Sequence, residues 1–288
     1  MTSPSERPAC GHVVGDLEIV GDLGSGLSGD VFLVRRQGDP NRTYVLKRHR
    51  RKKDGVTDEC FCGEIRLVEE QPIRGHMPDF IAKGEDNGTP YYVMSREGPL
   101  PEKTALTVEQ WLDWTLELVN AFELLNGRRH IFHRDVKPKN LRSTDGHPVI
   151  IDFGLACRND TDTPFPFERV GSRDYMAPEI VRYEPYTVQS EIYSTMKSVQ
   201  AILPDEARHA LSAALFHATE NAQARRTPSW SALRREIVVC RTAYRRESHR
   251  LMTALKRIGI VAYTTAIGYV LIYGAFFAWR IGKLLITP

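Results

Sequence analysis

Several features that would place this 288-residue chain in a special class are missing from its sequence. Its cysteines number five, and the two that lie close together, Cys60 and Cys62, form CxC rather than CxxC. This pattern fits neither a disulfide framework nor a zinc knuckle, so we expect reduced thiols in a reducing compartment. The first ten residues, MTSPSERPAC, hold no apolar run, and Thr2 is not glycine. We therefore expect neither a signal peptide nor N-myristoylation.

Most of the chain lacks an excess of positive charge. The formal net charge is +3, yet ten Lys and Arg residues against two Glu lie from Arg234 onward, so the remainder is net acidic. A basic surface for nucleic acid is therefore not expected on the main body. The composition, 42% hydrophobic and 26% charged, is ordinary for a globular protein with a sizeable core.

One long apolar run stands near the C-terminus. Residues 258–279 read IGIVAYTTAIGYVLIYGAFFAW and carry no charge. As a helix this run would be about 33 Å long, close to the ~30 Å hydrocarbon core of a bilayer. We predict a single transmembrane helix here rather than the alternative, a buried helix of the globular body.

The residues around this run predict its orientation. A basic juxtamembrane stem at 241–257 precedes it, and a short tail at 280–288 follows it. The excess of positive charge upstream favours a cytoplasmic body and a tail that crosses the membrane. The sequence thus predicts a single-pass, tail-anchored protein that contacts membrane lipid through its span and its basic stem.

The N-terminal part of the chain has the pattern of a β-sheet. Short runs rich in β-branched and aliphatic residues, separated by turn residues, predict strands. These runs are Leu17–Val20, Val31–Val34, Thr43–Lys47 and Pro90–Met94.

Two segments have a helical pattern. Asp58–Glu70 is the first, and Thr107–Gly127 is the second, with an apolar residue at every third or fourth position. In the second, Thr107 and Gln110 fit a capping box and Gly127 is expected to end the helix.

Strands therefore come first and helices follow, which predicts an α+β fold with two lobes. We expect an N-terminal tail at 1–13, a β-rich N-terminal lobe at 14–98 and a mostly helical C-terminal lobe at 99–240. The segment Glu97–Glu102, EGPLPE, would connect the lobes.

Three glycines lie in the segment GSGLSGDV, between two of the predicted strands. They are Gly24, Gly26 and Gly29. A dinucleotide-binding fingerprint would need a helix after the glycines. The context instead predicts a hairpin whose backbone can approach phosphate groups closely, because no Cβ intervenes.

Two carboxylates stand in unusual settings. Asp135 lies in IFHRDVKPKN among four basic side chains. Asp152 directly follows the apolar residues Val149–Ile151. A carboxylate after a buried strand needs a partner, and Mg²⁺ suits it because this ion takes hard oxygen ligands and bridges phosphates. Lys47 and Glu64 would be solvated charges in isolation, but in a nucleotide site Glu64 would hold the ammonium against phosphates.

Three motifs then occur in a familiar order: HRDVKPKN at 133–140, DFG at 152–154 and APE at 177–179. With them, Asn140 stands five residues after Asp135, as in the kinase signature. Over about residues 14–240 the chain resembles the eukaryotic-type (Hanks-type) serine/threonine protein kinases. The resemblance implies a two-lobed kinase fold, ATP and Mg²⁺ as cofactors, and transfer of the γ-phosphate to Ser and Thr hydroxyls of proteins, including the chain itself.

The resemblance also implies catalytic roles. Asp135 would orient the substrate hydroxyl and accept its proton, and Lys137 would neutralise the transferring phosphoryl group. Asn140 and Asp152 would hold Mg²⁺, and Lys47 would bind the α- and β-phosphates.

The implied nucleotide-binding residues come from the N-terminal lobe and its connection. Val31 would pack over the adenine, Met94 would be the gatekeeper, and Ser95–Glu97 would form the hinge. The full set is Gly24, Gly26, Gly29, Val31, Lys47, Glu64, Met94, Ser95 and Glu97.

Other positions refine the resemblance. The pair Lys137-Pro138 and the residue Ser172 resemble the serine/threonine type. Arg134 is typical of kinases controlled in the activation loop, so we expect phosphorylation of Thr161 or Thr163 and pairing with Arg134. The alternative is that both threonines are simply solvated.

The chain departs from the family after APE. Glu191, in EIYSTM, stands where these kinases have the aspartate that braces the HRD backbone. Only about 60 residues separate Glu179 from the basic stem, so we expect a shortened C-terminal lobe. Arg226, or else Arg225, is expected to pair with Glu179. These departures bear on peptide specificity more than on nucleotide chemistry.

Two other functions compete with a membrane-anchored protein kinase. A pseudokinase would bind ATP and act as a membrane scaffold, but degraded catalytic residues would be expected. A small-molecule or lipid-like substrate kinase would not need the APE motif or the Lys137-Pro138 pair. Incubation with protein substrates and with lipid extracts distinguishes the three.

Overall fold

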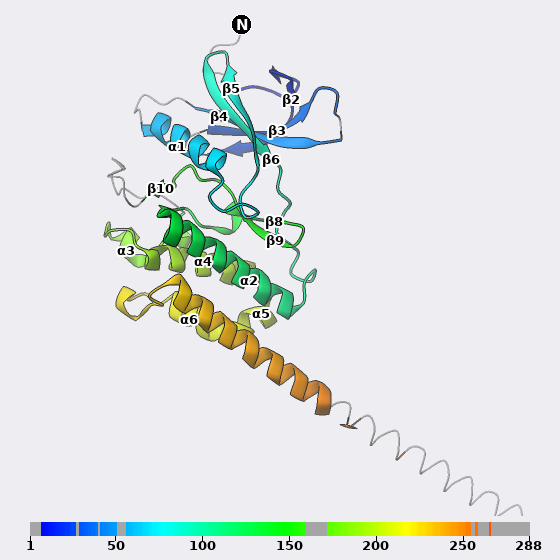
Figure 1. The fold of residues 1–288 in the computed structure, drawn as a ribbon, viewed down its shortest axis with the longest axis vertical. Coiled ribbons are helices and arrows are strands. Elements are labelled where there is room, and N and C mark those ends of the chain that lie inside the picture. The colour runs from blue at the N-terminus through cyan, green and yellow to red at the C-terminus, as the bar shows by residue number, and fades with distance from the viewer. Residues whose placement is uncertain are drawn as a thin grey trace, which may run out of the picture. The chain divides into compact units, whose positions relative to one another are not determined.

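The computed structural model describes residues 7–26, 29–39, 41–50, 56–158, 172–254, 257–258 and 265. The chain divides into two compact units, Met1–Cys240 and Arg241–Pro288. The first unit contains both predicted lobes (Figure 1). Within the second unit, residues 241–254 are helical.

The N-terminal lobe is built on a six-stranded antiparallel sheet with strand order β1-β2-β3-β4-β6-β5 (Figure 1). The strands are β1 (Val13–Val14), β2 (Leu17–Ser25), β3 (Gly29–Arg36), β4 (Thr43–His49), β5 (Phe80–Asp86) and β6 (Thr89–Ser95). The four predicted strands fall inside β2, β3, β4 and β6. The sequence did not reveal β1, which has two residues, or β5, whose FIAKGED lacks an apolar alternation.

One face of this sheet carries the apolar core of the lobe, with Ile19, Phe32 and Leu46 almost fully buried. The helix α1 (Val56–Glu70) covers the predicted Asp58–Glu70 segment. Its Phe61 ring lies 5.8 Å from the ring of Tyr92 in β6. This packing fixes the helix against the sheet and so determines where its polar residues point.

The C-terminal lobe begins with α2 (Val108–Glu123), and the predicted capping box is confirmed. The Gln110 N–H donates to Thr107 Oγ1 at 3.3 Å, and the Thr107 N–H donates to Gln110 Oε1 at 2.8 Å. The prediction that Gly127 ends this helix was wrong. The chain instead passes into a π-helical turn, η1 (Leu124–Arg128), which contains Gly127.

Short elements surround the catalytic segments in the rest of this lobe. The strands are β7 (Ile131–Phe132), β8 (Leu141–Thr144), β9 (His147–Ile150) and β10 (Cys157–Arg158), paired as β7–β10 and β8–β9. The helices are η2 (Pro138–Asn140), η3 (Arg173–Tyr175), α3 (Pro178–Val181), α4 (Val188–Ile202), α5 (Asp205–Ala210), α6 (Ser212–Ala218) and η4 (Gln223–Arg225). Residues 230–240 are helical and complete the unit. The lobe is mostly helical, as expected.

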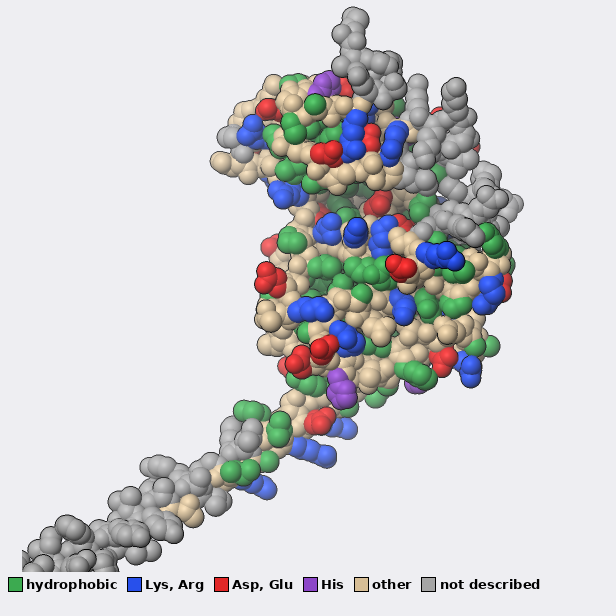
Figure 2. Space-filling view, turned by 180° about the vertical axis from the view of Figure 1, so that it is seen from behind, with side chains coloured by type: hydrophobic (Ala, Val, Ile, Leu, Met, Phe, Trp, Pro, Cys, Tyr) green, Lys and Arg blue, Asp and Glu red, His purple; other side chains and the backbone are tan. Residues whose placement is uncertain are grey.

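The two lobes meet at a hollow in the surface of the first unit (Figure 2). Segment 96–107, which contains the predicted Glu97–Glu102 connection, has no regular structure and joins β6 to α2. The architecture is therefore the expected two-lobed α+β fold.

Among the described residues, no helix has both the length and the hydrophobicity needed to cross a membrane. The predicted span at 258–279 lies outside the described residues except for Ile258 and Thr265, and the tail at 280–288 lies wholly outside them. The predicted span therefore stays a prediction.

Candidate active site

The glycine-rich segment forms the turn between β2 and β3, as predicted. Gly24 pairs with Val31, and the Gly26 N–H donates to the Gly29 carbonyl at 2.8 Å. Gly24 has φ +114°, which favours glycine, and a Cβ on Gly29 would lie 2.6 Å from the carbonyl oxygen of Arg48. The two residues at the tip, 27 and 28, lie outside the described residues.

Lys47, Glu64 and Asp152 come together from β4, α1 and the segment after β9. Lys47 Nζ donates to both carboxylate oxygens of Glu64 at 2.8 Å and to Asp152 Oδ1 at 2.9 Å. The side chains of Lys47 and Glu64 are 3% and 0% exposed. The predicted ammonium–carboxylate pair is therefore present and is shielded from water.

Electrostatics keep Lys47 and Asp152 of this cluster charged. Burial alone would lower the pKa of Lys47, but the carboxylates of Glu64 and Asp152 outweigh that effect and raise the pKa. The Lys47 ammonium lowers the pKa of Asp152 to about 2. Asp152 also has φ +65°, an uncommon conformation for a residue other than glycine. The site thus holds an ionised carboxylate in a constrained position.

The catalytic loop gathers Lys137, Asn140 and Ser172 around Asp135. Asp135 Oδ2 accepts from Lys137 Nζ at 2.7 Å and from Asn140 Nδ2 at 3.3 Å. Its Oδ1 accepts from Ser172 Oγ at 3.2 Å, and Asn140 Nδ2 also donates to the Asp135 carbonyl at 3.0 Å. Asp135 is only 8% exposed. One carboxylate therefore contacts a cation, an amide and a serine hydroxyl.

His133 joins this loop to the segment that carries Asp152. Its Nε2–H donates to the Ile151 carbonyl at 3.0 Å, and its Nδ1 accepts from the Asp135 N–H at 3.3 Å. These partners require a neutral imidazole, and burial accordingly lowers the pKa of His133. Its ring also contacts Phe153, with centroids 4.9 Å apart.

Glu191 occupies the bracing position that the sequence predicted. From α4, its Oε1 accepts from the N–H groups of His133 at 2.8 Å and Arg134 at 3.2 Å. Its side chain is completely buried, and burial raises the pKa of Glu191 to about 7. The longer side chain thus reaches the backbone that an aspartate would hold.

The predicted hinge residues use their side chains to join the lobes. Ser95 Oγ donates to Glu97 Oε1 and accepts from the Asp79 N–H, and Thr144 Oγ1 in β8 donates to Glu97 Oε2 at 2.5 Å. Ser95 and Glu97 line a cavity of about 450 Å³ together with Asp79 and Thr144. Met94, the predicted gatekeeper, is buried in β6. The Ser95 N–H is also engaged, because it donates to the Asp79 carbonyl at 2.9 Å. The lining of this cavity includes none of Val31, Lys47 and Asp152.

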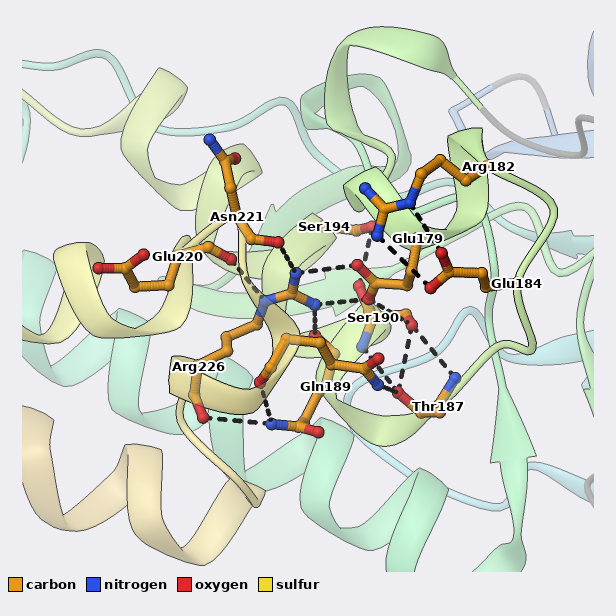
Figure 3. Close-up of polar contacts among 11 residues, drawn as sticks. Glu179, Arg182, Glu184, Thr187, Gln189, Ser190, Ser194, Glu220, Asn221 and Arg226 are labelled. Carbon is orange, nitrogen blue, oxygen red and sulfur yellow. Dashed lines mark hydrogen bonds and ion pairs between the residues drawn. The ribbon is translucent and has the colours of Figure 1, made fainter.

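The APE glutamate pairs with Arg226, which decides between the two predicted arginines. Arg226 donates to Glu179 from both terminal nitrogens, at 2.6 and 2.9 Å, and Ser190 Oγ adds a bond at 2.8 Å (Figure 3). The guanidinium also lies 4.8 Å from the Tyr193 ring centroid. Arg225 is exposed. The ion pair joins α3 to the segment that precedes the helical residues 230–240. The Ser190 bond adds α4 to this contact.

Two supporting residues were missed by sequence reasoning. The Tyr92 hydroxyl donates to Glu64 Oε1 at 3.0 Å, and Asn126 Nδ2 donates to Glu191 Oε2 at 3.2 Å. Tyr92 lies opposite Lys47 in the β4–β6 register, so a correct strand pairing would have revealed it. Asn126 had no local signal, because its partner is 65 residues away. The predicted phosphorylation sites Thr161 and Thr163 lie outside the described residues.

Comparison with known families identifies this arrangement. A model of the protein kinase domain matches residues 17–207, about two thirds of the chain. The chain belongs to the protein kinase family. The kinase domain as matched contains the glycine-rich turn, the Lys47 cluster, the catalytic loop and Glu191.

Individual relatives agree with this assignment. The chain is 30% identical over 195 residues to the dual specificity mitogen-activated protein kinase kinase dSOR1 of Drosophila melanogaster, covering 62% of this chain and 46% of the relative. It is 31% identical over 185 residues to the serine/threonine-protein kinase AtPK2/AtPK19 of Arabidopsis thaliana, covering 58% of this chain and 36% of the relative. The chain thus matches less than half of the length of these curated relatives.

The chemistry of the site fits ATP and Mg²⁺, which protein kinases use in general. Asn140 commits its amide nitrogen to Asp135, so its oxygen is the atom suited to a cation. Asp152 supplies an ionised carboxylate. Among the described residues, no group of three or more His, Cys, Asp and Glu side chains could hold a metal by itself. Mg²⁺ at nucleotide sites is held by one or two protein carboxylates and completes its shell with phosphate and water oxygens.

Proposed function

We propose that this protein is a serine/threonine kinase that transfers the γ-phosphate of ATP to protein hydroxyls, including its own. The observation that carries this proposal is the set of contacts made by Asp135. Its carboxylate already accepts a serine hydroxyl, from Ser172, and lies 2.7 Å from the Lys137 ammonium. A substrate hydroxyl at the same oxygen would be oriented by a carboxylate able to accept its proton.

The other residues would act mainly through charge and position. Lys47, held by Glu64, would contact the α- and β-phosphates, and Lys137 would stabilise the negative charge of the transferring phosphoryl group. Asn140 and Asp152 would hold Mg²⁺, which supplies further neutralisation of phosphate charge when bound. Lys47 and Glu64 are buried, which strengthens the electrostatic interaction between them.

The serine/threonine specificity is supported by the Lys137-Pro138 pair and by the contact of Ser172 with Asp135. The relatives include proteins named serine/threonine-protein kinases, and one is named a dual specificity kinase. We infer Ser and Thr as the acceptors, with the peptide sequence around them unassigned.

We further propose that the kinase is tethered to a membrane by residues 258–279, with the kinase domain on the cytoplasmic side and the tail at 280–288 crossing. The support is the uncharged apolar run and the basic stem that precedes it. Tethering would raise the effective concentration of membrane-surface substrates.

The test of the activity is phosphate transfer from labelled ATP with Mg²⁺ by the full chain in mild detergent. Myelin basic protein and the chain itself serve as acceptors, and phosphoamino-acid analysis identifies the acceptor residue. We expect phosphoserine or phosphothreonine, with at least a hundredfold loss in Asp135→Asn and in Asp152→Asn. The exposed Asp205→Asn serves as the control and should keep full activity.

The competing pseudokinase scaffold makes the opposite prediction. It would bind ATP, seen as a rise in melting temperature, but would show no transfer that depends on Asp135. Transfer to lipid extracts in preference to protein would instead favour a lipid-like substrate.

A further inference from the structure

Trp230 contacts Asn126, which in turn contacts Glu191, the residue that holds the catalytic loop. Trp230 lies beyond the part of the chain that the kinase-domain model matches, which ends at residue 207. Its side chain belongs to the first of the helical residues 230–240 and is 3% exposed. The indole stacks on Phe122 of α2, with centroids 5.3 Å apart and planes 12° apart. Its Nε1–H donates to Asn126 Oδ1 at 2.6 Å.

Asn126 connects Trp230 to Glu191, which holds the catalytic loop. It lies in the π-helical turn η1 and is 5% exposed. Its amide nitrogen donates to the Ile131 carbonyl at 2.5 Å and to Glu191 Oε2 at 3.2 Å. One orientation of the amide satisfies all three partners, with the oxygen toward the indole donor and the nitrogen toward two acceptors. Single π-turns within helices are frequent at functional sites.

Glu191 completes the connection. While its Oε2 accepts from Asn126, its Oε1 accepts from the backbone N–H groups of His133 and Arg134. Glutamate has one more rotatable bond than the aspartate expected at this position, so it loses more conformational freedom when fixed. A second contact on its other oxygen restricts that freedom.

We propose that Trp230 is a positioning residue for phosphoryl transfer: through Asn126 and Glu191, its indole N–H fixes the backbone of His133 and Arg134 and hence the placement of Asp135. The inference rests on the proposed kinase function. It also gives the helical residues 230–240 of the C-terminal lobe a role in placing the catalytic loop. Without the indole donor, the buried Asn126 oxygen would lack its hydrogen bond and the amide would be less firmly held.

The test compares two matched substitutions in the full chain. Trp230→Phe keeps an aromatic ring against Phe122 but removes the N–H. Trp111→Phe is the control, because Trp111 is also fully buried and also donates one indole hydrogen bond, to the Lys103 carbonyl at 3.3 Å, away from Glu191.

Two measurements separate positioning from general stability. In Trp230→Phe we expect kcat to fall about tenfold while KM for ATP stays within about twofold, because the Lys47 cluster is untouched. We also expect faster hydrogen exchange in the peptide that contains the His133 and Arg134 amides. Trp111→Phe should lower the melting temperature without either change.

The possible outcomes are distinct. A Trp230→Phe protein that matches Trp111→Phe in both kcat and local exchange overturns the inference. If Trp230→Phe does not fold, Asn126→Ala interrupts the same connection, and unchanged kcat and exchange in that variant overturn it equally. If the unmodified chain shows no transfer, the proposed function fails, and the exchange comparison still decides whether Trp230 holds this backbone.

Discussion

Single side chains in this kinase acquire their properties from the groups placed beside them. Burial alone would lower the pKa of Lys47, whereas Glu64 and Asp152 together raise it. Asp135 likewise depends on Lys137 and Asn140, which hold its carboxylate at 2.7 and 3.3 Å. The basic loop therefore presents the Asp135 carboxylate as a hydrogen-bond acceptor, held in place by a charge-assisted bond from Lys137.

Glu191 gives a pH-dependent stability that can be measured. Its pKa is about 7 in the folded protein and 4.5 ordinarily. Below pH 4.5 the carboxyl is protonated in both states, but between pH 4.5 and 7 the unfolded chain ionises first. The free energy of unfolding should therefore fall by about 3 kcal/mol over this window because of Glu191, and then level off.

Glu191→Gln isolates this effect because glutamine does not titrate. We expect the difference in the free energy of unfolding between the two proteins, from urea denaturation at pH 4.5 to 8, to follow the curve just described. The neighbouring groups Arg134, Tyr186 and Cys157 interact electrostatically with Glu191, but they are present in both proteins. Parallel curves across the window would contradict the prediction.

At the level of elements, α4 organises the C-terminal lobe. It holds the catalytic loop at two points, through Glu191 and through Ser198, whose Oγ donates to the Val136 carbonyl at 3.2 Å. On another turn, Ser190 donates to Glu179 of α3. For Ser190, Glu191 and Ser198, the cost of burying a polar side chain is offset by a partner in a neighbouring element.

The ion pair between Glu179 and Arg226 should be important for the stability of these elements. Arg226→Met leaves the buried Glu179 carboxylate without its cation, so we expect a loss of about 3 kcal/mol in the free energy of unfolding. The neighbouring exposed Arg225→Met is the matched control and should change it by less than about 0.5 kcal/mol. Equal melting temperatures for the two variants would show that the pair contributes nothing.

At the scale of the whole molecule, the proposed tether would determine where the protein acts. We expect the full chain to remain in the membrane pellet after alkaline carbonate extraction, whereas a chain that lacks residues 258–288 should be released. The reason is the cost of exposing 22 uncharged residues to water.

The orientation can be checked in sealed vesicles with the cytoplasmic face outward. Added protease should digest the kinase domain and leave a tag after residue 288 protected. Release of the full chain by carbonate would contradict the span, and digestion of the tag would contradict its orientation.

The sequence alone determined the lobes, the strands with clear apolar alternation, the capped start of α2 and the motif residues of the site. These features are local: each depends on residue types within a few positions of one another, as with Thr107 and Gln110. The tertiary structure decided which distant groups meet. In the structure Glu179 pairs with Arg226 and not with Arg225, and α2 continues into a π-helical turn that contains Gly127. Asn126 contacts both Glu191 and Trp230. Contacts across 65 and 104 residues depend on packing between elements, which no local pattern encodes.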